Sequence, residues 1–142
     1  MQDIFDVPGS AAPKSASLDL VVADPTAPRL DFERLDVYRV AVEFHALAAS
    51  LRLPPGRREL RDQLDRAALS VVLNTAEGAG RTGAADKARF YAMARGSAME
   101  CAALFDVLGN LRIAPRPTCV RARALLVRIV QMHTRLCVRR KP

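Results

Sequence analysis

The sequence predicts an all-α protein, an antiparallel up-down four-helix bundle with a flexible N-terminal tail. Apolar residues recur at spacings of three and four along most of the chain, which is the period of a helix. Alanine and leucine dominate the apolar residues and favour helices, while the strict alternation of Val, Ile and Thr that is typical of strands is absent. The chain has 142 residues, half of them hydrophobic, which suits one domain with one core.

We divide the chain into a mobile N-terminal tail, residues 1–30, and the bundle, residues 31–142. Four prolines stand in the tail among Ser, Ala and Gly, and this composition buries little surface. The apolar segment 18–22 is an exception and could dock on a neighbour as a strap.

The first two helices are predicted from their caps and apolar stripes. The first begins at Asp31 as N-cap and ends before Pro54. Its predicted apolar stripe is Leu35, Tyr38, Val42, His45 and Ala49, with Ala41 and Ala48 beside it. The second covers residues 58–77, with Gly78 in the left-handed position that follows a helix. Its stripe is Leu60, Leu64, Ala68, Val71 and Thr75.

The third and fourth helices follow from the same signals. The third begins after a cap at Thr82 or Gly83 and stops at Gly109-Asn110, with the stripe Phe90, Ala94, Ala98, Cys101, Phe105 and Leu108. Gly96 inside it predicts the close approach of another helix. The fourth runs from about Thr118 to Arg139, with the stripe Ala122, Leu126, Ile129, His133 and Leu136. Further apolar residues make this stripe wider than a bundle core needs, which predicts contact with another subunit: Val120, Val127, Val130 and Cys137.

The charge of the chain is strongly asymmetric. The formal net charge is +7, the first 30 residues are net −2, and no acidic residue follows Asp106. Such a surface attracts polyanions such as nucleic acid, although a basic face that is merely solvated is the alternative. Three arginines at intervals of seven share one helix face, and with the C-terminal bases they form the candidate nucleic-acid-binding set: Arg121, Arg128, Arg135, Arg139, Arg140 and Lys141.

A polar stripe on the second helix indicates a second candidate site. Gln63, Arg66, Ser70, Asn74 and Glu77 are spaced by three and four and lie on one face. We expect a structural polar network, buried or bridging two subunits, although the stripe could also face water. Its predicted members are Arg66, Asn74, Glu77, Ser97 and Glu100.

The sequence contains no recognisable catalytic machinery, and we expect no enzyme activity, cofactor or metal. His45 and His133 lie on apolar stripes without metal-ligand spacing, and the three cysteines are interpreted as reduced core residues. The segment 78–81, Gly-Ala-Gly-Arg, could cradle a phosphate, but a tight interhelical turn is the favoured interpretation. Without an apolar run of membrane-spanning length or a secretion signal, the chain is expected to be cytoplasmic and away from the membrane.

Three segments resemble a known family: QLDRAALSV at 63–71, NTAEGAGR at 74–81 and RFYAMARGSAME at 89–100. They are similar to the four-helix-bundle proteins encoded in intervening sequences of 23S rRNA genes, which include the accessory variability proteins of diversity-generating retroelements. The resemblance covers residues 32–138, with departures at Thr75, Gly83 and Ala102 that could weaken a cap and the core. It implies a basic, ring-like homo-oligomer, commonly a pentamer, without enzymatic activity. In the retroelement branch it implies binding to nucleic acid and a reverse transcriptase.

These observations favour a non-enzymatic, oligomeric module that binds RNA or DNA through phosphates. It could act as an accessory to a reverse transcriptase or to an rRNA-associated element. The alternative is an oligomeric protein-interaction scaffold that does not bind nucleic acid.

Overall fold

The computed structural model describes residues 25–138 and is all-α over that range, as predicted. Its four helices are α1 (Asp36–Ser50), α2 (Arg58–Gly80), α3 (Ala84–Asn110) and α4 (Arg116–Val138). A short 3₁₀ helix, η1 (Asp31–Arg34), precedes α1. Within residues 25–138, no helix combines the length and the apolar composition needed to cross a bilayer.

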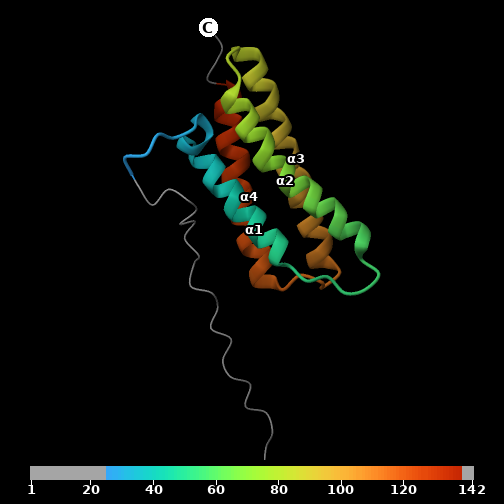
Figure 1. Cartoon of the computed structure of the whole chain (residues 1–142). Coiled ribbons are helices and arrows are strands. Elements are labelled where there is room, and N and C mark those ends of the chain that lie inside the picture. Colours follow the sequence, from blue (N-terminus) through green and yellow to red (C-terminus); the bar gives the residue numbers. More distant parts are fainter. Residues whose placement is uncertain (1–24, 139–142) are drawn as a thin grey trace, which may run out of the picture.

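The helices form a bundle in which consecutive helices run in opposite directions (Figure 1). The α1–α2 and α3–α4 connections lie at one end of the bundle, and the α2–α3 connection lies at the other (Figure 1). Each helix contacts the next one in the chain, and α1 also contacts α4, so the four helices enclose one core.

The core is built from the stripes predicted for the last three helices. Leu64, Ala68, Val71 and Thr75 of α2 are buried, as are five of the six residues of the α3 stripe. In α4 the buried stripe includes Ala122, Leu126, Ile129 and His133. Phe44 of α1 meets Phe105 of α3 edge-on across this core, with 5.9 Å between ring centroids.

The prediction for the first helix was wrong in its start and in its buried face. The α-helix begins at Asp36, because the chain first makes the 3₁₀ turn and then extends at Leu35. The Glu33 carboxylate, rather than Asp31, caps this turn by accepting a hydrogen bond from the Leu30 N–H at 2.6 Å. The buried residues are Val37, Val40, Ala41, Phe44 and Ala48, which include the two alanines predicted beside the stripe but none of the five stripe residues. Both stripes have helical spacing, and the helix turns so that the bulky Phe44 enters the core.

Gly78 lies inside α2 rather than after it, which corrects the predicted helix end. The ring of Tyr91 in α3 packs directly on Gly78, where a Cβ would lie 2.8 Å from the ring atoms Cδ1 and Cε1. By contrast, a Cβ built at Gly96 meets no described atom within 4 Å, so the close approach predicted there is wrong within the single chain. The absence of a side chain at Gly78 therefore sets how closely α2 and α3 approach each other.

The remaining boundaries differ little from the predictions. Gly83 is the N-cap of α3, and α3 ends at Asn110. The last helix begins at Arg116, before the predicted Thr118, because a proline at position 117 fits the first helical turn, where its missing N–H is not needed. Residues 25–30 contain a turn but no helix. The rest of the predicted tail, including the segment 18–22, lies outside the described residues.

Replacing Gly78 with alanine should destabilise the bundle by about 1–3 kcal/mol, because the new methyl group must displace the Tyr91 ring. The matched control is Gly96→Ala, which meets open space and should stabilise the helix by up to about 1 kcal/mol. Urea unfolding followed by circular dichroism measures both changes. Equal effects of the two substitutions would contradict the role assigned to Gly78.

Candidate nucleic-acid interface

The three predicted arginines of α4 are exposed, but they are not equivalent. Arg121 forms an ion pair with Glu43 of α1, with 2.6 Å between Nη2 and Oε1. Arg128 and Arg135 are exposed and have no ion pair with any residue in 25–138. They therefore offer free guanidinium groups along the outer face of α4. The other three predicted bases, Arg139, Arg140 and Lys141, lie outside the described residues.

Apolar side chains are exposed on α3 and α4 as well. Val120 and Val127, two of the residues that widened the predicted stripe, are exposed, while Val130 and Cys137 are half-buried. Further exposed apolar side chains occur on α3: Met93, Met99 and Val107. Both helices thus present apolar surface that the core of a single chain does not cover.

A largely apolar groove of about 720 Å³ lies between the start of α1 and the end of α4. Arg135 and Asp36 lie on this groove together with apolar residues: Leu35, Val37, Met132, Leu136 and Val138. A free arginine therefore stands beside an apolar hollow, a combination that suits an acidic, partly apolar segment of a partner protein.

The predicted polar network is smaller than expected and links only α2 and α3. The Oγ atoms of Ser70 and Ser97 lie 2.8 Å apart, and the Asn74 amide donates to the Ser70 Oγ at 2.8 Å and to its carbonyl at 3.0 Å. Of the predicted members, only Asn74 and Ser97 take part. Arg66 and Glu100 are exposed and have no ion pair among the described residues. Ser70, a member of the predicted polar stripe, is the residue that connects Asn74 and Ser97.

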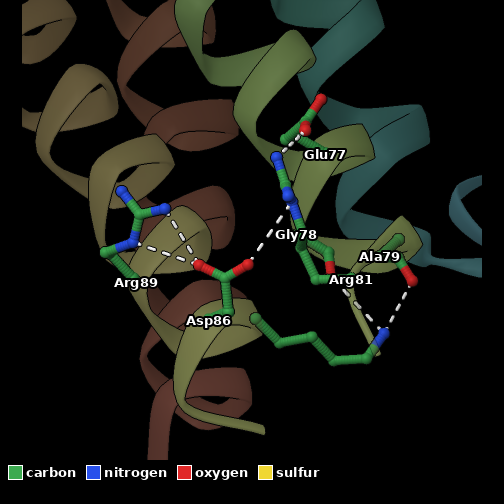
Figure 2. A network of polar contacts seen from close by, with 7 residues as sticks. Glu77, Gly78, Ala79, Arg81, Asp86 and Arg89 are labelled. Atoms are coloured by element: carbon green, nitrogen blue, oxygen red, sulfur yellow. Dashed lines mark hydrogen bonds and ion pairs between the residues drawn. The ribbon is translucent and has the colours of Figure 1, made fainter. Parts of the chain in front are cut away.

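Glu77 belongs to a separate cluster at the α2–α3 turn (Figure 2). It pairs with Arg81, whose Nε also lies 3.5 Å from Asp86 Oδ2. Asp86 accepts a further hydrogen bond from Arg89 at 2.9 Å. The guanidinium groups of Arg81 and Arg89 each lie 4.6 Å from the ring centroid of Phe90.

The segment 78–81 forms the last turn of α2 and its connection to α3, as in the favoured interpretation. Lys87 Nζ donates to the Ala79 carbonyl at 2.6 Å and so satisfies an acceptor that the end of α2 leaves open. Every basic side chain of this turn therefore has an acidic or carbonyl partner (Figure 2).

The histidines and cysteines are dispersed. His133 is fully buried, and its Nε2 lies 2.8 Å from Thr75 Oγ1, which itself donates to the Val71 carbonyl. Burial lowers the pKa of His133 from 6.5 to about 4; the backbone of Ile129 opposes this shift and the positive charge of Arg95 adds to it, so the imidazole is neutral near pH 7. Burial raises the pKa of the Cys101 thiol to about 12. All three cysteines are unpaired, but Cys119 and Cys137 are only half-buried, so the prediction of core cysteines holds fully for Cys101 alone.

A family model described as 23S rRNA-intervening sequence protein matches residues 33–135. The chain belongs to this family. The match covers most of the bundle and excludes the N-terminal tail. No curated protein sequence matches the chain.

The segments that resemble the 23S rRNA-intervening sequence proteins contain the residues of the α2–α3 contact. Gly78 and Tyr91 are among them, together with Arg81 and Phe90 of the turn. Thr75, a departure from the family pattern, was expected to weaken the core, but its buried hydroxyl bonds to both the Val71 carbonyl and His133. The recognisable motif of this family member therefore holds two helices together.

The neutral, buried His133 predicts a loss of stability in acid. In the unfolded chain the imidazole of His133 takes up a proton near pH 6.5, whereas in the folded chain it does so only near pH 4. The neutral imidazole therefore makes its full contribution to the free energy of unfolding above pH 6.5. This contribution is lost as the pH falls to about 4, a decrease of about 3 kcal/mol in total.

Urea unfolding at several pH values, compared between the natural chain and His133→Leu, measures this contribution. The difference in the free energy of unfolding between the two proteins should change across that window. A half-buried histidine provides the control, since His45→Gln should leave the pH dependence of His133 in place. An unchanged pH profile in His133→Leu would rule out this role for the buried imidazole.

Proposed function

We propose that this member of the 23S rRNA-intervening sequence protein family is a non-enzymatic homo-oligomer that binds RNA or DNA through its phosphates. The observation that carries the proposal is the pair of free guanidinium groups, Arg128 and Arg135, on an α4 surface without any acidic residue of its own. Arginine suits phosphate oxygens because its planar fork donates two hydrogen bonds at once. Contacts of this kind carry little sequence information, so binding depends mainly on charge.

Oligomerisation is supported by the exposed apolar side chains of α3 and α4. Five apolar side chains of these two helices are exposed in the single chain: Met93, Met99, Val107, Val120 and Val127. The family resemblance favours a pentamer. Repeating a weak phosphate-binding surface around a ring raises the overall affinity without any new contact within the subunit.

The absence of enzymatic activity is supported by the state of the groups that usually carry catalysis. His133 is enclosed by the core and held by Thr75, and the Cys101 thiol stays protonated at neutral pH. The description of the family points to rRNA, so structured RNA is the first ligand to test. An accessory role beside a reverse transcriptase would use the same basic surface.

The alternative function, a protein-interaction scaffold without nucleic-acid binding, is favoured by the apolar groove beside Arg135. Under this alternative the basic face only solvates the protein. Charge substitutions on α4 separate the two functions.

We predict that Arg128→Glu/Arg135→Glu weakens binding to a structured RNA and to duplex DNA by roughly 10- to 100-fold at about 0.1 M salt. The slope of log affinity against log salt concentration should fall by about two, one for each lost phosphate contact. Arg121 is left unchanged, because a reversed charge there would face Glu43. Fluorescence anisotropy across a salt series measures both quantities.

The control for this prediction is Arg34→Glu/Arg66→Glu, which changes the net charge equally at exposed positions outside α4. Its affinity should decrease by much less than that of the α4 variant. If the natural chain binds neither nucleic acid even at low salt, the proposal of nucleic-acid binding is wrong, and the alternative of a protein-interaction scaffold is favoured.

Subunit association should depend on the apolar residues of α4. Val120→Glu/Val127→Glu places two charges on that surface, and the molar mass measured by light scattering should fall to that of a smaller assembly. Leu30→Glu, at an exposed apolar position outside the four helices, should leave the mass unchanged. A monomeric natural chain would contradict the proposed homo-oligomer directly.

A further inference from the structure

The two connections at one end of the bundle are rich in arginine and contain no acidic residue. The α1–α2 connection includes Arg52 and Arg57, and the α3–α4 connection with the start of α4 includes Arg112 and Arg116. No acidic residue occurs from position 44 to 58 or after Asp106. We call these four residues the loop-end arginines.

The fold brings these two distant stretches of sequence to the same end of the bundle (Figure 1). Both connections also send apolar side chains to the one core, Leu51 and Leu53 from the first and Ile113 and Ala114 from the second. The loop-end arginines are therefore carried by connections anchored in a common core.

The loop-end arginines are also free. All four are exposed, and none has an ion pair or side-chain hydrogen bond with a residue in 25–138. Two neighbouring arginines differ in this respect. Arg61 is half-buried and donates to the Leu51 and Ala48 carbonyls, and Arg58 lies 3.8 Å from Asp62.

The opposite end of the bundle provides an internal comparison. At the α2–α3 turn, Arg81 and Arg89 are paired with Glu77 and Asp86, and Lys87 is bound to backbone carbonyls (Figure 2). The basic side chains of the α2–α3 turn are thus paired within the fold, whereas the four loop-end arginines have no partner among the described residues. Unpaired positive charge on connections that contain no acidic residue raises the local positive potential.

The α3–α4 connection also has a shape that suits an anion. Arg112 and Arg116 both line a hollow of about 530 Å³, together with Gly109, Ala114, Pro115 and Cys119. Arg112 adopts a left-handed backbone conformation, with φ of 56°, and its N–H donates to the Gly109 carbonyl at 3.0 Å. This conformation is uncommon for a residue other than glycine, and it makes the turn that places two arginines on one hollow.

We propose that this end of the bundle is a phosphate-backbone binding site for nucleic acid. Arg112 and Arg116 contact one phosphate group at the hollow, and Arg52 and Arg57 contact neighbouring phosphates of the same strand. The site rests on the proposed nucleic-acid function and adds to it a surface separate from the α4 arginines. A nucleic-acid strand that lies across the end of the bundle would bridge two connections that are far apart in the sequence.

The test compares Arg112→Gln/Arg116→Gln with a control that removes the same charge elsewhere, Arg34→Gln/Arg66→Gln. The probes are an RNA hairpin and a short DNA duplex, and the measurement is anisotropy across a salt series. The loop-end variant should bind roughly 10- to 100-fold more weakly than the natural chain at about 0.1 M salt, with a salt slope smaller by about two. The control should lose much less. Arg52→Gln/Arg57→Gln, on the other connection, should reproduce the loss and keeps the test valid if the first variant fails to fold.

The outcomes separate this site from the proposed function. If the natural chain binds a probe and both loop-end variants bind like the control, the loop-end site is wrong and the nucleic-acid function stands. Equal losses in the loop-end variants and the control would also overturn the site, since net charge alone would then account for binding. If the natural chain binds neither probe at low salt, the nucleic-acid function itself is wrong. Circular dichroism and the unfolding temperature verify that each variant is folded.

Discussion

The contact between Gly78 and the ring of Tyr91 determines how near α3 lies to α2, and much of the bundle depends on it. Because the two helices lie close together, the hydroxyl groups of Ser70 and Ser97 share a hydrogen bond, and the Asn74 amide donates to the Ser70 hydroxyl. The Tyr91 ring also lies 6.2 Å from the ring of His133, which in turn bonds to Thr75. One missing side chain thus allows three helices to meet, because packed interiors have no room for an extra methyl group.

The two ends of the bundle use positive charge differently. At the α2–α3 turn, arginines and a lysine close the connection by binding carboxylates, an aromatic face and carbonyl oxygens. At the other end, apolar side chains such as Leu51 and Ala114 anchor the connections, and Arg61 binds the Leu51 and Ala48 carbonyls, so the four loop-end arginines are left without a partner among the described residues. A residue that the fold does not use is available for a partner, and a cluster of free guanidinium groups suits a polyanion.

The buried His133 and Cys101 are part of the core. A core histidine whose pKa is lowered to about 4 by burial and a core thiol whose pKa is raised to about 12 are both neutral at physiological pH. Neither contributes a charge to the surface or a reactive group to a cleft. The surface of α4 combines the exposed apolar residues Val120 and Val127 with the unpaired arginines Arg128 and Arg135.

The sequence alone determined the all-α class, the number of helices, the buried stripes of α2, α3 and α4, and the family, because helical periodicity and local stop signals are properties of short segments. It did not determine the buried face of α1, where two stripes had equal spacing and only packing around Phe44 distinguished them. It located the close helix approach at Gly96, whereas the structure places it at Gly78, because both glycines are helical and only the neighbouring helix differs. It named five network members, of which Asn74 and Ser97 join the hydrogen bonds between α2 and α3, with Ser70 as their partner, whereas Arg66, Glu77 and Glu100 do not. The loop-end arginines were likewise beyond sequence reasoning, since only the tertiary structure brings positions near 52 and 112 to the same end of the bundle.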